Sequence, residues 1–416
     1  MNEILEQQLA GSKRTALSLR LCDTEQKNRA LHRIGDAILN CADEILAANA
    51  EDVAAAKQHG MNPIMLDRLL LTRERLESIV EGVRTVEALP DPVGRVLSSE
   101  VMKNGLEIEK ISVPFGVVAM IYESRPNVTV DCAVLCVKSG NCAVLRSGRD
   151  AAHTCGVIAE VMRDAVAEAG FDKNIIQYIG DTSRQTAEEL MRAKGYVDLL
   201  IPRGGAGLIQ TVVNTATVPV IETGTGNCHI YVDKDADLNM AVDIVYNAKT
   251  SRPSVCNAAE SLVVHRDVAE VFLPMAEKRL REKQVVLYGC PEAAAILPGA
   301  ERASEQDFYT EYLDYKMSVK IVGSVCEAVD FINEHSTSHS ECIVTENNET
   351  AEYFLKAVDS AAVYRNASTR FTDGGEFGLG AEIGISTGKL HARGPMGLDS
   401  LTTSKFVVRG QGQTRG

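Results

Sequence analysis

The residues best suited to chemistry lie in the stretch SRPSVCNAAES, residues 251–261, which holds one of the chain's 11 cysteines. Cys256 follows Pro253 in a polar turn, and Lys249 and Arg252 precede it closely. A thiol near positive charge ionises more readily and can act as a thiolate nucleophile. The alternative interpretation is a small buried hydrophobic residue, which is the usual role of cysteine. The pattern makes Cys256 a candidate nucleophile and leaves that alternative open.

The other cysteines and the histidines give weaker signals. Five cysteines fall inside helix or strand patterns and are predicted to be structural: Cys132, Cys136, Cys142, Cys155 and Cys342. His335 and His339 have i, i+4 spacing in a turn-like polar segment, but no cysteine pair completes a zinc site there. We therefore predict no metal.

Two further stretches could hold an anion. GGAGLI, residues 204–209, follows an apolar strand pattern and opens a helix, so the free N–H groups near Gly204 and Gly205 could bind a phosphate. LRSGRD follows the strand pattern NCAVL and places Arg146 and Arg149 at its carboxyl end, where open α/β sheets bind ligands. The alternatives are an ordinary tight turn and a solvated pair of surface arginines.

Hydrophobic periodicity predicts the elements that position these residues. Residues 1–59 and 63–89 have helical patterns, and 106–113 alternates like an exposed strand. From residue 115 apolar runs alternate with helical patterns, first up to PVIETG (219–224) and CHIYVD, and then in a second series that follows DLNMAVDIVYNAKT. This alternation predicts βαβ units with parallel sheets. The tail SLTTSKFVVR predicts an edge strand.

Composition excludes several functional classes. The 416 residues carry 57 acidic and 43 basic side chains, a net charge of −14, which argues against nucleic acid or an anionic membrane as the main partner. No apolar run is long enough for a spanning helix, and no signal peptide is visible. With an odd number of cysteines, this pattern favours reduced thiols and a cytoplasmic location.

Long stretches of the chain resemble gamma-glutamyl phosphate reductases, a branch of the aldehyde dehydrogenase superfamily. The matching segments include IYESRPNVTVDCAVLCVKSGNCAVLRSGRDA, DLLIPRGGAGLI, VPVIETGTGNCHIYVD, KTSRPSVCNAAESL, VDFINEHSTSHSECIV and FGLGAEIGISTGKLHARGPMGL. The HSTSHSE and LHARGP blocks are specific to this branch. The resemblance runs along essentially the whole chain and places the family's nucleophilic cysteine on Cys256.

The resemblance implies an aldehyde-dehydrogenase-like α/β fold with three parts. An NADP-binding Rossmann-type domain would span residues 1–225, interrupted by oligomerisation strands at about 97–113. A catalytic α/β domain would span 226–395. Residues 396–416 would form a C-terminal oligomerisation strand and tail, which pairs across subunits in a homo-oligomer and protects strand edges.

The implied activity is that of an NADP-dependent, phosphorylating glutamate-5-semialdehyde dehydrogenase. It reduces L-glutamyl 5-phosphate with NADPH to L-glutamate 5-semialdehyde and phosphate, the second step of proline biosynthesis. Cys256 would form a thioester, and each tetrahedral stage needs a donor for its oxyanion. Asn127 is the expected side-chain donor, with Ser124 as a near-equal positional match and a helix N-cap as the other interpretation of Asn127. A complex with glutamate 5-kinase, which makes the unstable substrate, is left open.

The resemblance also assigns binding residues. Arg146 and Arg149 match positions that in NAD-dependent relatives carry a lysine and an acid, and arginine suits the 2′-phosphate of NADPH. Gly204 and Gly205 would form the turn beneath the cofactor. Glu222 matches the glutamate that activates water in hydrolytic relatives, and we expect it on the cofactor side or in a structural role.

The substrate's carboxylate or phosphate is the expected partner of three cationic residues, Arg125, His391 and Arg393, with surface ion pairs as the alternative. Two other functions are weighed. One is a dehydrogenase that oxidises a semialdehyde to a free acid with water, which Glu222 supports. The other is a catalytically silent NADP-binding or scaffolding protein, which would not need the Cys256 thiolate.

Overall fold

The computed structural model describes residues 1–415, apart from the side chain of Ile64. The chain forms two compact units. Unit 1 comprises Met1–Glu222, Gly378–Gly384 and Met396–Gly416, and unit 2 comprises Thr223–Phe377 and Ile385–Pro395. The sequence analysis placed the boundary between the cofactor domain and the catalytic domain at residues 225 and 226. The functions assigned to these two domains stay predictions.

Unit 1 begins with a run of helices: α1 (Glu3–Leu19), α2 (Thr24–Asn40), α3 (Ala42–Gln58), α4 (Pro63–Leu69) and α5 (Arg73–Ala88). The prediction of one helix over 63–89 is wrong, because the chain leaves the helix at residues 70–72. There the N–H of Leu71 donates to the Asn49 side chain, and Thr72 caps α5 by accepting a hydrogen bond from the N–H of Arg75. These side-chain partners satisfy the backbone groups that the break exposes.

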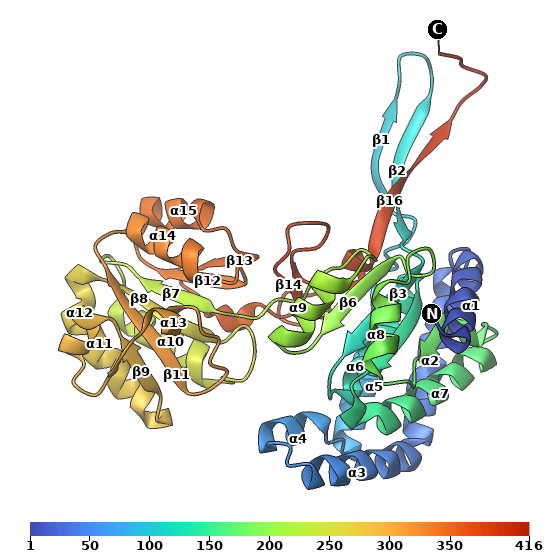
Figure 1. Cartoon of the computed structure of the whole chain (residues 1–416). Helices are drawn as coiled ribbons and strands as arrows, with labels where there is room; N and C mark the ends of the chain where they lie inside the picture. Colours follow the sequence, from blue (N-terminus) through green and yellow to red (C-terminus); the bar gives the residue numbers. More distant parts are fainter. Residues whose placement is uncertain (416) are drawn as a thin grey trace. The chain divides into compact units, whose positions relative to one another are not determined.

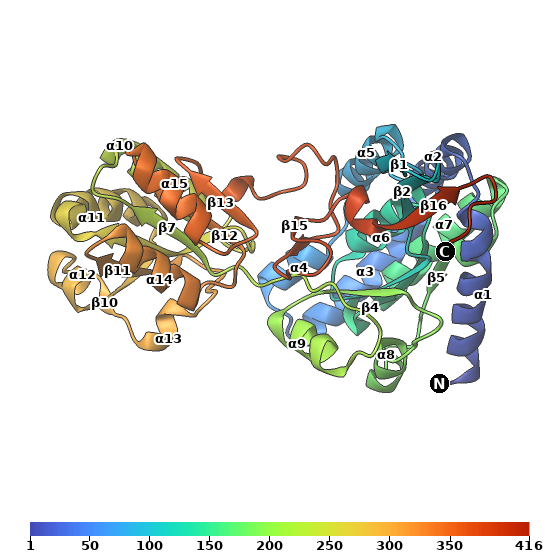
Figure 2. The ribbon, with the colours of Figure 1, turned by 90° about the horizontal axis from the view of Figure 1, so that it is seen from above.

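The centre of unit 1 is a parallel four-stranded sheet in the order β5-β4-β3-β6. Its strands are β3 (Val117–Tyr122), β4 (Cys142–Ser147), β5 (Ile176–Tyr178) and β6 (Leu199–Arg203). The connections contain α6 (Pro126–Lys138), η1 (Arg149–Ala151), α7 (Ala152–Glu168), η2 (Lys173–Ile175), α8 (Arg184–Met191) and α9 (Ala206–Thr215). α1 contacts β3, β4 and β5, whereas α2 packs on α5 and α7 (Figure 2).

A second sheet of unit 1 is small and antiparallel. It contains β1 (Val96–Val101), β2 (Glu107–Pro114) and β16 (Thr402–Arg409) in the order β1-β2-β16, with η5 (Leu398–Leu401) leading into β16. Figure 1 shows this sheet extending away from the helices and the parallel sheet of the same unit. The predicted tail strand is therefore confirmed as an edge strand, and it pairs with β2 of its own chain.

Unit 2 contains a parallel sheet of seven strands in the order β10-β9-β11-β8-β7-β12-β13. The strands are β7 (Cys228–Val232), β8 (Ala259–His265), β9 (Val286–Gly289), β10 (Glu301–Arg302), β11 (Lys316–Val322), β12 (Ser340–Val344) and β13 (Ala362–Arg365). The helices are α10 (Leu238–Thr250), α11 (Arg266–Leu280), η3 (Arg281–Lys283), α12 (Pro291–Ile296), α13 (Glu305–Phe308), α14 (Val325–His335), α15 (Asn348–Ala357) and η4 (Thr369–Phe371).

Apolar side chains cover both faces of this sheet. One core joins the sheet to α10, α11 and α12, and the other joins it to α14 and α15, which Figure 1 shows on one side of the strands. The expected α/β class with parallel sheets is confirmed. No helix within residues 1–415 is long and apolar enough to cross a membrane.

The predicted strand at 219–224 is wrong. Only single bridges form there, between Leu200 and Val220 and between Thr223 and Ser386. Pro219 has no N–H to donate, so the segment cannot complete a ladder along β6. Ser386, the partner of Thr223, belongs to β14 (Ile385–Ser386). This strand pairs with β15 (Gly394–Pro395) in a short hairpin of unit 2.

Candidate active site

Cys256 lies in a turn between α10 and β8, and its side chain is partly exposed. We call residues 251–257 the Cys256 loop. The loop begins at Ser251, the C-cap of α10, and ends just before β8 enters the buried sheet. A thiol in such a turn is accessible to a substrate while its backbone is anchored by two regular elements.

The backbone of Cys256 rests on the chain that leads into β7. A Cβ atom on Gly226 would lie 1.4 Å from the carbonyl oxygen of Cys256, so only glycine fits at this close approach. The Cys228 thiol donates to the same carbonyl oxygen over a distance of 3.2 Å. These contacts fix the backbone of Cys256.

The segment around η4 holds the other end of the loop. The hydroxyl of Thr369 donates to the carbonyl of Asn257 at 2.7 Å, and the amide of Asn257 donates to the carbonyl of Thr372 at 2.8 Å. The Arg370 guanidinium donates from Nε to Ser251 Oγ at 3.1 Å and from Nη1 to Asn257 Oδ1. Arg370 therefore contacts the first and the last residue of the Cys256 loop.

The five cysteines predicted to be structural are buried in elements, as expected. Burial raises the pKa of Cys155 to about 11 and those of Cys136 and Cys342 to about 12. Burial also raises the pKa of the Cys132 and Cys142 thiols. Thiols of this kind stay protonated near neutral pH and are poor nucleophiles.

Lys249 does not supply the positive charge expected near Cys256. Its ammonium is fully buried and lies 2.5 Å from a carboxylate oxygen of Glu260, which is equally buried. Burial lowers the pKa of Lys249 and raises that of Glu260. The other oxygen of Glu260 accepts a hydrogen bond from the N–H of Leu313. This bond holds the pair of Lys249 and Glu260 in the core.

Unit 1 has a ligand-binding geometry at the carboxyl edge of its parallel sheet. The chain runs from β3 through β4 to β5 on one side and then returns to β6 on the other side of β3. This reversal is a topological switch point, where open α/β sheets form a crevice for ligands. The loop after β3 starts with Glu123, whose N–H donates to the carbonyl of Arg203 at the end of β6.

The glycine turn at this switch point already binds an anionic side chain of the protein. The N–H of Gly205, the N-cap of α9, donates to Glu123 Oε2 at 2.8 Å. A Cβ atom on Gly204 would lie 2.6 Å from that oxygen. The turn thus has the anion-binding character predicted for it, and a cofactor phosphate at this position would take the place of the Glu123 carboxylate.

Arg146 and Arg149 differ in their surroundings. Arg146, at the end of β4, is 7% exposed and donates from Nη2 to the carbonyl of Ser183 at 2.8 Å. Its Nε is buried and finds no hydrogen-bond partner within the described residues. Arg149 is exposed in η1. A buried donor without a partner, beside the switch point, fits an anionic cofactor.

Of the two candidates for the oxyanion donor, Ser124 lies in the connection between β3 and α6, and Asn127 lies in the first turn of α6. The N-cap of α6 is Arg125, so the N-cap interpretation of Asn127 is wrong. The Asn127 amide donates to Asp131 at 3.1 Å, and burial raises the pKa of Asp131 to about 6. Ser124 is buried and its hydroxyl donates to Asp150 at 3.4 Å.

The expected substrate residues have different positions. Arg393 donates to both Asp359 Oδ1 and the Asp359 carbonyl at 2.9 Å, and Lys389 pairs with the same carboxylate. His391 is exposed and has a left-handed backbone with a φ of 64°. These residues and Cys256 belong to unit 2, whereas the remaining predicted site residues belong to unit 1: Arg125, Asn127, Arg146, Arg149, Gly204, Gly205 and Glu222.

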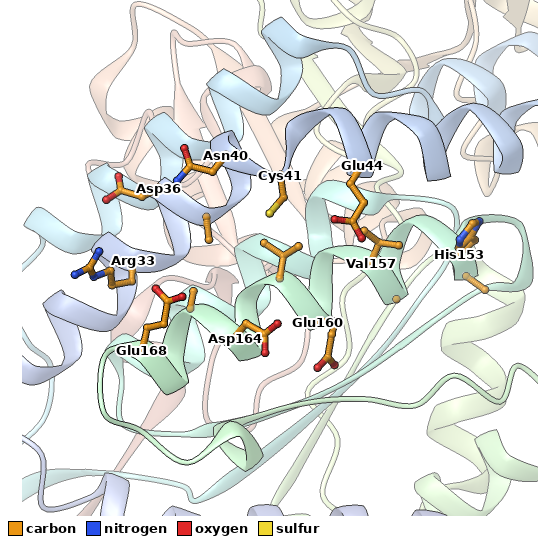
Figure 3. A pocket seen from close by; sticks show the side chains of 15 residues that line it. Arg33, Asp36, Asn40, Cys41, Glu44, His153, Val157, Glu160, Asp164 and Glu168 are labelled. Carbon is orange, nitrogen blue, oxygen red and sulfur yellow. The ribbon is translucent and has the colours of Figure 1, made fainter.

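A separate cavity of about 640 Å³ opens between α2, α3 and α7 (Figure 3). None of the predicted site residues lines it. Its wall carries five carboxylate side chains and only two basic ones: Asp36, Glu44, Glu160, Asp164 and Glu168, with Arg33 and His153. Such a wall repels phosphorylated ligands, so this cavity is not the candidate active site.

Comparison with known proteins decides the family. The sequence model of the aldehyde dehydrogenase family matches residues 5–295. The chain belongs to the aldehyde dehydrogenase family. This is a family of oxidoreductases, so the predicted enzyme class is confirmed.

Two curated relatives show how specific the relation is. The chain is 57% identical over 398 residues to the gamma-glutamyl phosphate reductase of Streptococcus suis, covering 96% of each chain. It is 54% identical over 404 residues to that of Enterococcus faecalis, covering 97% of each. The crystal structure of gamma-glutamyl phosphate reductase from Thermotoga maritima matches with a TM-score of 0.97 and 46% identity, covering 99% of this chain and 100% of that one. The resemblance stated from the sequence motifs is confirmed.

Sequence reasoning missed three side chains that shape these two sites: Glu123, Cys228 and Arg370. Glu123 stands next to the predicted Ser124 and Arg125, so its position after a buried strand was a readable signal. Cys228 and Arg370 had none, because each acts on the Cys256 loop from a distant part of the sequence. Membership of the aldehyde dehydrogenase family alone does not assign a role to any of the three.

Proposed function

We propose that the chain reduces L-glutamyl 5-phosphate to L-glutamate 5-semialdehyde and phosphate in proline biosynthesis, with NADPH as the reductant. The observation that carries this proposal is the 57% identity over 96% of the chain to a protein named gamma-glutamyl phosphate reductase. An accessible thiol in a braced loop supports it, because acyl transfer from an acyl phosphate needs a positioned nucleophile.

In this reaction the Cys256 sulfur, as a thiolate, forms a bond to the acyl carbon. The bond between that carbon and the phosphate oxygen breaks, and phosphate leaves with the electron pair, so that a thioester remains on Cys256. When bound, NADPH supplies the hydride that reduces the thioester carbon. The carbon–sulfur bond then breaks, the aldehyde is released and the Cys256 thiolate is restored.

The oxyanion of each tetrahedral stage needs fixed donors. The backbone N–H of Cys256 is held in place by the contacts of its carbonyl with Gly226 and Cys228. Asn127 remains the proposed side-chain donor, with Ser124 as the alternative. Either side chain would have to exchange its present carboxylate partner for the substrate oxygen.

The cofactor proposal rests on unit 1. Arg146 has a buried guanidinium with an unfilled donor, and Arg149 follows three residues later, at the start of η1. Both suit the 2′-phosphate of NADPH. The turn at Gly204 and Gly205 suits the pyrophosphate, and Glu222 is proposed as a cofactor-side residue because thioester hydrolysis would waste the intermediate.

Substrate contacts are proposed for Arg125, His391 and Arg393. Arg393 would first have to release Asp359, which now neutralises its charge. His391 and Arg125 are the other two candidates for the substrate's carboxylate or phosphate. The small sheet of unit 1 is proposed to pair with a second copy of the chain in a homo-oligomer, since its exposed side includes apolar side chains such as Phe406 and Val408.

The proposal is tested by NADP⁺ reduction with glutamate 5-semialdehyde, measured with and without inorganic phosphate. We expect the initial rate to depend on phosphate in a saturable way, and arsenate to replace phosphate. The second candidate, oxidation to the free acid with water, is favoured by Glu222. It predicts the full rate without phosphate and loss of that rate in a Glu222→Gln variant.

A third outcome concerns the silent scaffold. A protein without catalytic function gives no NADP⁺ reduction under any of these conditions, although it can still bind the cofactor. The three results therefore separate the proposed reaction, the hydrolytic reaction and a binding function.

A further inference from the structure

Two guanidinium groups, those of Arg252 and Arg370, accompany the nucleophile in unit 2. Arg252 belongs to the Cys256 loop itself and is exposed. Arg370 lies across the loop, bonded to Ser251 at its start and to Asn257 at its end. The only residues between these two contacts are 252–256, so the guanidinium of Arg370 lies alongside the segment that carries the nucleophilic sulfur.

The positive charge of Arg370 is only partly offset by a carboxylate. No ion pair of either guanidinium group with a carboxylate is found within residues 1–415, although Asp373 acts on Arg370 electrostatically. Asp373, whose Oδ1 accepts from the N–H of Gly375 at 2.9 Å, raises the pKa of Arg370, but by less than Arg252 lowers it. The Cys256 loop therefore presents an excess of positive charge next to the thiol.

Electrostatics agrees with this arrangement. Burial and then the neighbouring Arg252 lower the pKa of Arg370, whereas Asp373 and a thiolate at Cys256 raise it. Two cations this close repel one another, and a dianion placed between them would remove the repulsion. Guanidinium groups are also the preferred partners of phosphate oxygens in proteins.

We propose that Arg370, assisted by Arg252, binds the phosphoryl group of the acyl phosphate and holds the departing phosphate beside Cys256. This inference rests on the proposed function, since it names the phosphate subsite of that reaction. In the forward direction the two cations stabilise the phosphate as the carbon–oxygen bond breaks and its electron pair passes to the leaving oxygen. In the reverse direction they hold inorganic phosphate for attack on the thioester.

The competing interpretation is that Arg370 only braces the Cys256 loop. A brace would lower the rate at every phosphate concentration without changing the concentration needed for half-saturation. A phosphate-binding residue changes that concentration itself. The split between KM for phosphate and KM for the semialdehyde therefore distinguishes the two roles.

The test uses the full chain in the reverse direction, with four variants: Arg370→Gln, Arg370→Lys, Arg252→Gln and, as a control, Arg266→Gln. Arg266 lies on α11 of the same unit and forms an exposed ion pair with Glu292. We expect Arg370→Gln to raise KM for inorganic phosphate roughly 10- to 100-fold, with KM for the semialdehyde changed less than about twofold.

We expect intermediate increases for Arg370→Lys and Arg252→Gln and none for Arg266→Gln. Because Arg370→Gln also removes two loop contacts, its thermal midpoint is measured beside its kinetics. If it does not fold, Arg252→Gln decides, since within residues 1–415 the hydrogen bonds to the Ser251 and Asn257 side chains come from Arg370 and not from the Arg252 side chain. An unchanged KM for phosphate in Arg252→Gln and in every folded Arg370 variant overturns the inference.

A second readout does not depend on turnover. In the unmodified chain, inorganic phosphate should slow alkylation of Cys256 by iodoacetamide, and sulfate should do so less. This protection should disappear in Arg370→Gln or, if that variant is unfolded, weaken in Arg252→Gln. If the unmodified chain reduces NADP⁺ without phosphate, the proposed function fails, and the alkylation result alone then decides whether the phosphate subsite exists.

Discussion

Cys256 differs from the chain's buried cysteines through its surroundings and not through its side chain. Burial raises the pKa of thiols such as Cys132 and Cys142, which lie inside α6 and β4. Cys256 sits in a turn, partly exposed, with two guanidinium groups near its loop and the Cys228 thiol beneath its carbonyl. The same functional group is thus a packing residue in one place and a candidate nucleophile in another.

Arg146 is the residue through which cofactor choice can be tested. We expect Arg146→Gln to weaken NADPH binding roughly tenfold or more while NADH binding changes little, because a charge-assisted hydrogen bond to the 2′-phosphate is lost. Cofactor fluorescence titration measures both constants without turnover. Arg192→Gln, a change on the exposed end of α8, serves as the control. Equal loss of NADPH and NADH affinity in Arg146→Gln would contradict the assignment.

A single functional residue can be predicted from the sequence only where its neighbours in the sequence reveal its role. Cys256 stands out through its turn and neighbouring charge, and Gly204 and Gly205 through the helix that follows. Arg370 cannot be found in this way, because its partners Asn257 and Ser251 lie 113 and 119 residues away. Lys249 misleads for the opposite reason: it is close in sequence, but its charge is bound by Glu260 in the core.

Elements with long, continuous patterns were predicted well. The apolar runs of β3, β4, β7 and β8 are fully buried strands, as their composition indicates. The errors occur where a side chain from elsewhere competes with the local pattern. Asn49 binds the backbone between α4 and α5, and Pro219 prevents a strand beside β6. The hydrophobic periodicity of a segment does not reveal such contacts.

The small sheet of unit 1 carries the prediction about assembly. Phe406 and Val408 of β16 are 67% and 54% exposed, which favours burial against another copy. We expect the double substitution Phe406→Glu, Val408→Glu to convert an oligomer into smaller species in size-exclusion chromatography with light scattering, with circular dichroism unchanged. The control is Val271→Glu, at an exposed apolar position on α11 that is 59% exposed. An unmodified chain that is monomeric, or a variant with unchanged mass, would contradict this prediction.

On the scale of the whole molecule, the chain passes from one unit to the other several times. Residues 378–384 and 396–416 rejoin unit 1 after the chain has built unit 2, and 385–395 pair with unit 2 in between. The sequence pattern predicted two α/β parts and a separate tail strand, because each has its own periodicity. It did not predict the short returns, because a segment as short as 378–384 has no periodicity of its own.

The central claim is that the Cys256 sulfur carries the acyl group between phosphate and hydride transfer. The most direct measurement compares Cys256→Ser with Cys326→Ser, which alters an exposed cysteine of α14, in phosphate-dependent NADP⁺ reduction by glutamate 5-semialdehyde. We predict that Cys256→Ser loses at least about a thousandfold in kcat while it still binds NADPH, and that Cys326→Ser keeps its rate. An undiminished rate in Cys256→Ser would contradict the account.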